Sequence, residues 1–183
     1  MISYQAAPLA IGPGRKGAIT PATKSANSIL TSTILAAAST TNVVTFAAQP
    51  DCVRVLTVKG NAGGIAGNVV ITGRDAAGGA LVDTIALSGA GEIIGVKAFK
   101  SVSSILLPAK TNGSGDAVSV GWADKFGLNN LLSDAGLLLY KRFNNSDDAG
   151  SLAVSPTVLA DNIYTLAGSA NGSKVLKLYY FIS

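Results

Sequence analysis

The residues of this 183-residue chain that are able to do chemistry are few, and they lack their usual partners. The chain has no histidine, so the most frequent general base and the most frequent metal ligand are both missing. Its single cysteine, Cys52, cannot form a disulfide within the chain, and Arg54 alone gives little support for a reactive thiol. We expect Cys52 to be a small buried hydrophobe, and we expect no zinc site.

Paired carboxylates are the remaining route to acid–base chemistry. Most candidates stand in or beside expected turns, where the carboxylate bonds to nearby backbone amides. The candidates are Asp75, Asp83, Glu92, Asp116, Asp124, Asp134, Asp147, Asp148 and Asp161. Residues 144–148 (NNSDD) lack the ligand spacing of a calcium loop, and glycine-rich residues 60–68 match no phosphate-binding motif. We therefore expect a protein that is not an enzyme, with no catalytic residue, metal or cofactor.

The composition points to a protein that packs against neighbours. Only 13% of the residues are charged, against about 25% in a typical soluble domain. The net charge is +4, and the basic residues are scattered, so we expect no nucleic acid as a partner. There is no secretory signal and no stretch of about 18 apolar residues, so we expect synthesis in a host cytoplasm and no membrane insertion.

The elements that would position any functional residue begin with an N-terminal arm. Residues 1–40 are rich in proline, glycine, serine and threonine and show little periodicity. This pattern predicts an extended arm, which is either a plain tail or a segment that orders against a partner subunit. The residues expected to bind a partner are Pro8, Pro13, Arg15, Lys16, Pro21 and Lys24.

Residues 41–183 predict an all-β domain, an antiparallel β-sandwich or small barrel with additional C-terminal strands. Short β-branched segments alternate with turn signals roughly every 8 to 12 residues. The expected strands are 42–48, 52–59, 68–72, 80–88, 92–102, 104–107, 117–122, 136–143, 152–154, 158–166 and 174–182. A short helix is predicted only within 128–139. Trp122 and the aromatic residues of 174–182 are expected in the core, with lysines guarding an edge strand.

Parts of residues 53–128 resemble β-sandwich proteins encoded among the structural genes of tailed phages. The segments that carry the resemblance are VRVLTVKGN, GNVVITG, DTIALSG, KAFK, ILLP and DAVSVG. The resemblance implies a virion protein, foremost a capsid decoration (cement) protein that binds the major capsid protein as a homo-oligomer, with a trimer favoured. It carries no catalytic residues. The alternatives are a neck, tail-tube or fibre-associated subunit, and a carbohydrate-binding, adhesin-like β-module.

Overall fold

The computed structural model describes residues 14–182, which form antiparallel β-strands and two short 3-10 turns. This confirms the predicted all-β, antiparallel class, and no α-helix occurs in this range. The strands are β1 (Gly14–Ile19), β2 (Ser25–Ile34), β3 (Thr41–Val43), β4 (Arg54–Gly60), β5 (Asn68–Arg74), β6 (Ala80–Ala86), β7 (Glu92–Phe99), β8 (Ser101–Leu107), β9 (Ala117–Gly127), β10 (Leu138–Phe143), β11 (Ser146–Asp147), β12 (Ser151–Ala153), β13 (Ile163–Thr165) and β14 (Leu176–Phe181); the turns are η1 (Ala135–Leu137) and η2 (Leu159–Asp161).

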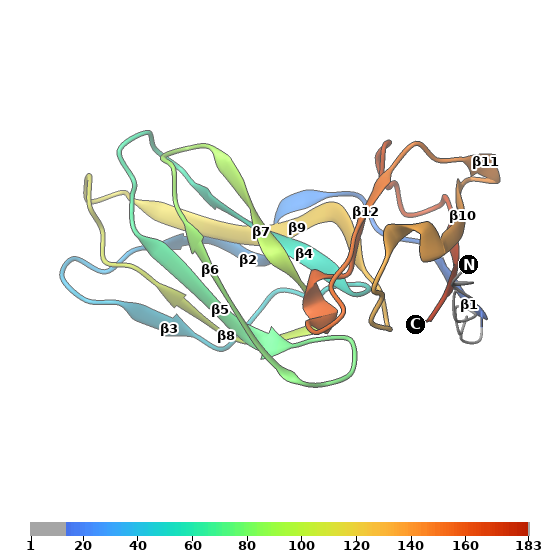
Figure 1. Cartoon of the computed structure of the whole chain (residues 1–183). Helices are drawn as coiled ribbons and strands as arrows, with labels where there is room; N and C mark the ends of the chain where they lie inside the picture. The colour runs from blue at the N-terminus through green and yellow to red at the C-terminus, as the bar shows by residue number, and fades with distance from the viewer. Residues whose placement is uncertain (1–13, 183) are drawn as a thin grey trace, which may run out of the picture.

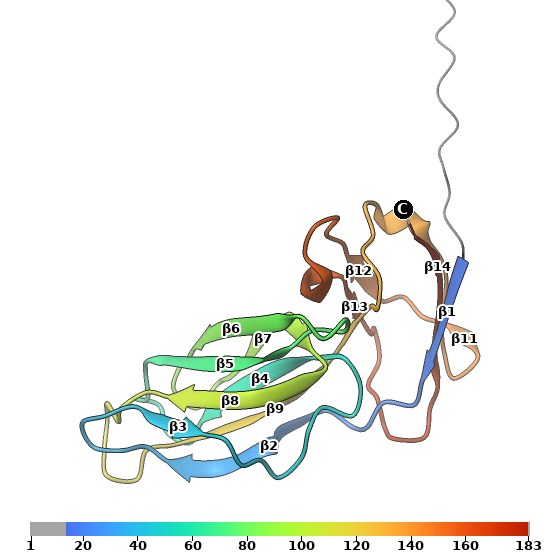
Figure 2. The ribbon, with the colours of Figure 1, turned by 90° about the horizontal axis from the view of Figure 1, so that it is seen from below.

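The strands form three sheets in two lobes (Figure 1). The central sheet has the order β12-β13-β9-β4-β7, with β2 also paired to β9, and the outer sheet has the order β3-β8-β5-β6. The terminal sheet has the order β1-β14-β10-β11 and makes a smaller lobe beside the sandwich (Figure 2). The two chain ends of the described range therefore meet in the smaller lobe, on neighbouring strands.

The outer sheet packs on the central sheet because its strands alternate buried and exposed side chains. In β6 every second residue is buried, and β5 follows the same pattern, so each strand turns one face to the core. The core cluster includes Leu56, Ile71, Phe99 and Ile105, all with no exposed surface. These residues come from the central and outer sheets, whose inner faces pack on each other.

The smaller lobe has a core of its own, and β9 links it to the sandwich. Val118, Val120 and Trp122 of β9 lie in the sandwich core, whereas Phe126 lies in the second core with Tyr164. One continuous strand therefore contributes to both cores. This shared strand ties the two lobes together.

Two expectations from the sequence are wrong in this part of the chain. The boundary at residue 40 does not separate an arm from the body, because β2 pairs with β9 and buries Ile29 and Leu30. The helix expected within 128–139 is absent; this segment holds only η1 and the start of β10. Leu128 and Leu132 are buried, although the segment between them is irregular. The Leu132 amide donates to Asn162 Oδ1 at 3.1 Å, so a side chain replaces the bond that a helix would have provided.

Candidate functional site

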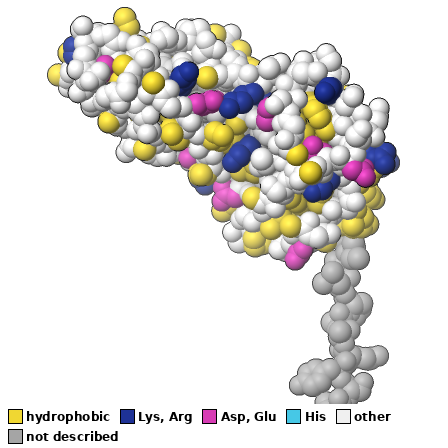
Figure 3. Space-filling view, turned by 90° about the horizontal axis from the view of Figure 1, so that it is seen from above, with side chains coloured by type: hydrophobic (Ala, Val, Ile, Leu, Met, Phe, Trp, Pro, Cys, Tyr) yellow, Lys and Arg dark blue, Asp and Glu magenta, His cyan; other side chains and the backbone are white. Residues whose placement is uncertain are grey.

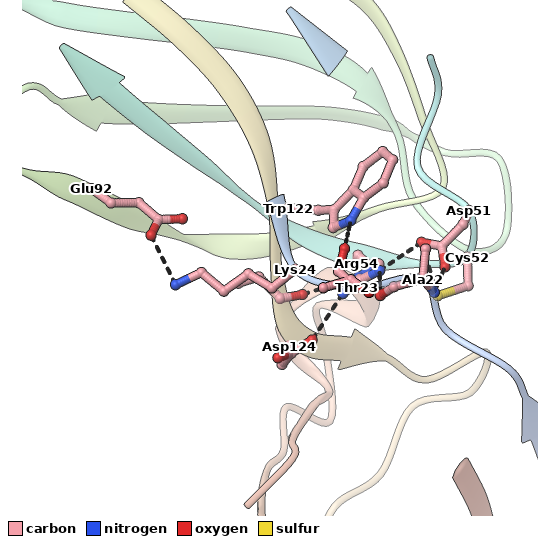
Figure 4. A network of polar contacts seen from close by, with 10 residues as sticks. Ala22, Thr23, Lys24, Asp51, Cys52, Arg54, Glu92, Trp122 and Asp124 are labelled. Atoms are coloured by element: carbon pink, nitrogen blue, oxygen red, sulfur yellow. Dashed lines mark hydrogen bonds and ion pairs between the residues drawn. The ribbon is translucent and has the colours of Figure 1, made fainter. Parts of the chain in front are cut away.

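A buried arginine fastens the chain between β1 and β2 to the sandwich (Figure 4). Arg54 has no exposed surface, and its guanidinium donates to two carbonyls and two carboxylates. Nε donates to the Ala123 carbonyl at 3.0 Å and Nη1 to the Ala22 carbonyl at 3.0 Å. Nη1 also pairs with Asp51 at 2.9 Å, and Nη2 pairs with Asp124 at 3.1 Å. The buried charge is thus compensated on several sides, as a buried ion requires.

The ring of Trp122 and a third ion pair complete this attachment. The Arg54 guanidinium carbon lies 5.5 Å from the centroid of the Trp122 ring, which is within range of a cation–π interaction. The Trp122 indole N–H donates to the Thr23 carbonyl at 3.0 Å. Lys24 Nζ lies 2.8 Å from a carboxylate oxygen of Glu92. Residues 22–24, which we call the anchor segment, are thus each bonded to the sandwich. These bonds determine where the chain passes from β1 to the sandwich.

Burial shifts two titratable groups beside Arg54 toward their protonated forms. Burial raises the pKa of Asp124, and the charge of Arg54 opposes that rise only in part. Burial, together with the Asp51 carboxylate, raises the pKa of the Cys52 thiol to about 12. A thiol with this pKa holds its proton at neutral pH, so Cys52 is not an activated nucleophile. Cys52 is half-buried and packs against the second core, rather than being fully enclosed as expected.

The outer surface of the terminal sheet gathers aromatic and basic side chains. Along β14, Leu176, Leu178 and Tyr180 are buried, and the residues between them are half-exposed on the opposite face. Tyr179 pairs across the sheet with Lys16 of β1 and with Tyr140 of β10. We call this surface the aromatic–basic face; its residues are Lys16, Tyr140, Arg142, Lys177, Tyr179 and Phe181.

The sequence-based expectation for these aromatic residues is therefore wrong for two of three. Only Tyr180 enters the core; burial raises its pKa, and its hydroxyl donates to Asn130 Oδ1 at 3.2 Å. β14 is also not an edge strand, because it lies between β1 and β10. Strict alternation along KVLKLYYFI is the sequence signal that separates Tyr179 and Phe181 from Tyr180.

A groove of about 370 Å3 crosses the aromatic–basic face. Lys16, Gly17, Ala18, Tyr140, Lys177, Leu178 and Tyr179 line it. Lys16 Nζ lies 6.0 Å from the centroid of the Tyr179 ring, and the Arg142 guanidinium lies 5.0 Å from that of Tyr140. No carboxylate lines this groove. It therefore offers a ligand aromatic rings and the positive charges of lysine side chains.

One acidic residue adjoins the face, and it is already paired. Arg142 Nε donates to Asp147 Oδ1 at 2.8 Å, and this bond raises the pKa of the guanidinium further. Lys177 Nζ donates to the neutral amide oxygen of Asn145 at 2.9 Å. Within residues 14–182, Lys16 and Lys177 form no ion pair with a carboxylate. The face therefore keeps a net positive charge.

The six residues expected to bind a partner are not brought together as a group. Pro8 and Pro13 lie outside the described residues. Arg15 and Lys16 are exposed on β1, and Lys16 contributes to the groove. The Pro21 carbonyl accepts from the amide of Gly172, in the loop that leads into β14, at 2.9 Å. Lys24 is held to the sandwich by its ion pair with Glu92 of β7.

Several carboxylates have structural roles. Asp116 is buried and accepts from the amides of Thr111, Asn112 and Gly113, as expected of a turn residue. Asp83 lies in β6, within the strand expected at 80–88, and is buried. No group of three histidine, cysteine or acidic residues in the described range is placed to hold a metal ion. In the same range, no helix is long and apolar enough to span a membrane.

A second surface, on the sandwich, has the opposite character. The outward side chains in the middle of the outer sheet are uncharged, and Val82 is 49% exposed. We call this the uncharged face; its residues are Asn42, Val70, Thr72, Val82, Thr84, Ser104 and Leu106. Figure 3 shows, for one side of the molecule, how widely the charged side chains are scattered.

Comparisons with protein-family models, with curated proteins and with solved structures find no match for this chain. The class that the fold defines is thus an all-β protein of three antiparallel sheets.

Proposed function

We propose that this chain is a non-enzymatic structural protein of a tailed-phage virion. Its role is that of a capsid decoration (cement) protein, which associates with copies of itself, foremost as a trimer, and binds the major capsid protein. The sequence resemblance provides the class of assembly. The surfaces described above support a role in packing against other subunits.

The observation that carries the proposal is the uncharged face. Across β8, β5 and β6, Leu106 stands opposite Val70, which stands opposite Thr84. The next row holds Ser104, Thr72 and Val82. A β-sheet face of small, branched and apolar side chains buries against a partner with little loss of charge hydration.

The division into two lobes supports simultaneous contacts. The uncharged face belongs to the sandwich, whereas the aromatic–basic face belongs to the smaller lobe. A protein with two separate surfaces can bind two neighbouring subunits at once, and joined contacts raise the effective affinity. This is the physical requirement for a protein that bridges joints of a shell.

The proposal is tested by adding charge to the uncharged face. Val82→Lys/Thr84→Lys places two cations where a subunit would desolvate them, so we expect co-sedimentation with decoration-free shells of the encoding phage to weaken at least about tenfold. Ala90→Lys/Ser173→Lys adds the same charge at exposed loop positions and serves as the control. Shell binding that is unchanged in the first variant, or absent in the wild type, would contradict the proposal.

A carbohydrate-binding β-module is the second candidate, because such a module needs exposed aromatic rings. Tyr140 is 36% exposed, and Tyr179 stands beside it on the same face. A glycan array separates the two functions. Glycan binding by the wild type that Tyr140→Ala removes, without any binding to shells, would favour this second candidate.

A further inference from the structure

We infer that β1 receives an extended, acidic segment of a partner protein, which adds to the terminal sheet as a further strand. The inference rests on the proposed function, because it names the chemistry of a partner subunit. It concerns the edge of the sheet beside the aromatic–basic face.

The edge of β1 is open within the described range. β1 pairs with β14 through six residue pairs, from Gly14 with Phe181 to Ile19 with Leu176. No strand of residues 14–182 pairs with its other side. Residues 14–18 are all exposed, so the side chains of residues 14–182 leave that edge uncovered. An edge strand of this kind presents N–H and C=O groups to which another strand can bond.

Several of the other sheet edges are short or blocked. β3, β11 and β12 contain three residues or fewer. The edge of β7 is blocked by Asp83, whose Oδ2 accepts from the amides of Val96 at 3.0 Å and Lys97 at 3.3 Å. A carboxylate that occupies two edge amides prevents a further strand from bonding there. β1 has six residues and no such block among the described residues.

The charge of β1 selects the occupant. Arg15 and Lys16 are consecutive, so their side chains leave the strand on opposite faces. Neither forms an ion pair with a described carboxylate, and β1 itself contains no acidic residue. A strand with acidic residues at neighbouring positions would meet both cations. A second copy of β1 would instead set like charges close together, which is destabilising.

The groove gives the added strand a second point of contact. It starts at Lys16, Gly17 and Ala18 on β1 and reaches Tyr140 on β10. A side chain directed onto this face from the new strand would pass over small residues toward Tyr179. Backbone bonds at the edge would then supply affinity, and the cations with the groove would supply selectivity.

Basic residues on an edge strand also have a simpler role, which is to repel other strands. The two roles differ in what they do to an acidic strand. A purely repulsive guard gives no binding of any peptide, whereas the inferred site binds an acidic peptide and rejects a basic one.

The experiment measures fluorescence anisotropy with labelled eight-residue peptides. The probes are a peptide with the repeat Asp-Asp-Val-Val, a peptide with the repeat Lys-Lys-Val-Val, and the aspartate peptide with every second backbone nitrogen methylated. We expect the wild type to bind the first peptide at least about tenfold more tightly than the other two, since methylation removes strand bonding but keeps the charge. Arg15→Glu/Lys16→Glu is expected to reverse the preference toward the lysine peptide, whereas Lys59→Glu/Lys110→Glu, with the same change in net charge, keeps it.

Three results would overturn the inference: no binding of the aspartate peptide, equal binding of its methylated form, or unchanged binding by Arg15→Glu/Lys16→Glu. Displacement of the peptide by an equal concentration of oligogalacturonate would also overturn it, because the site would then recognise an anionic glycan. These measurements need no shells. Strand addition and shell decoration can therefore fail separately: the charged variants of the uncharged face test decoration, and the peptides test only β1.

Discussion

Arg54 and Asp124 form a buried ion pair, with 3.1 Å between Nη2 and Oδ1, where β4 and β9 approach the smaller lobe. The side chain of Arg54 is completely buried, and that of Asp124 is 13% exposed. The same guanidinium also bonds the anchor segment through the Ala22 carbonyl. One side chain thus connects β4, β9 and the segment that leads into β2, so the position of β1 depends on it.

Removal of Arg54 is expected to destabilise the whole molecule. Arg54→Ala leaves two carboxylates and two carbonyls without their donor, and breaking a buried ion pair in this way lowers the free energy of unfolding by about 3–5 kcal/mol. Lys24→Ala removes a partly exposed ion pair and is expected to lower it by about 1 kcal/mol or less. Urea denaturation measures both; a loss below that of Lys24→Ala would contradict the role given to Arg54.

The carboxylate that blocks the edge of β7 should also contribute to stability. Asp83→Ala leaves the Val96 and Lys97 amides without an acceptor in a part-buried place, which predicts a loss of about 1–3 kcal/mol. Asp147 is 83% exposed in its ion pair, so Asp147→Ala is expected to change stability by about 0.5 kcal/mol or less. Equal losses in the two variants would show that the Asp83 bonds contribute nothing.

The turn at residues 111–116 predicts a dependence of stability on pH. Backbone amides bonded to Asp116 lower its pKa below the ordinary value of 3.8. The stabilisation from a lowered carboxyl pKa is complete above pH 3.8 and disappears as the pH falls through the lowered pKa. Thermal unfolding of the wild type and of Asp116→Asn between about pH 2 and 6 is the measurement. We expect the two curves to converge in acid; parallel curves would contradict the assignment.

The thiol of Cys52 is expected to be inert in the folded protein. With a pKa near 12, almost no thiolate exists at pH 8, and the thiolate is the reactive form. A disulfide reagent such as Ellman's reagent should therefore label Cys52 slowly in buffer and completely in concentrated urea. Labelling in buffer as fast as that of free glutathione would contradict the raised pKa.

Sequence patterns predict the strands of the sandwich well, because burial repeats with the period of the strand. In CVRVLTVK, Arg54 shares a face with Leu56 and Val58, and in ALVDTIALS, Asp83 shares a face with Leu81 and Ile85. A charged residue at an inward position is the signal of a buried polar network. The same alternation assigns Tyr179 and Phe181 to the outer face of β14.

Sequence patterns do not predict the N-terminal strands or the arrangement of the two lobes. β1 is exposed at five of its six positions, so its sequence has no alternation to detect. The register of β2 against β9 shifts twice, and the consecutive residues Ile29 and Leu30 are both buried. The buried positions of β2 therefore do not follow the two-residue period of a regular strand. Both strands exist because distant strands, β14 and β9, offer backbone partners. Pairing over such sequence distances is a tertiary property that local composition does not contain.

The mass of the purified protein in solution, measured by light scattering after size-exclusion chromatography, tests the central claim most directly. A decoration protein that associates with copies of itself predicts a discrete homo-oligomer, foremost a trimer of the 18.3 kDa chain. A ring of six or more subunits would indicate a neck or tail component instead. A monomer at all concentrations that also fails to bind shells would contradict the account.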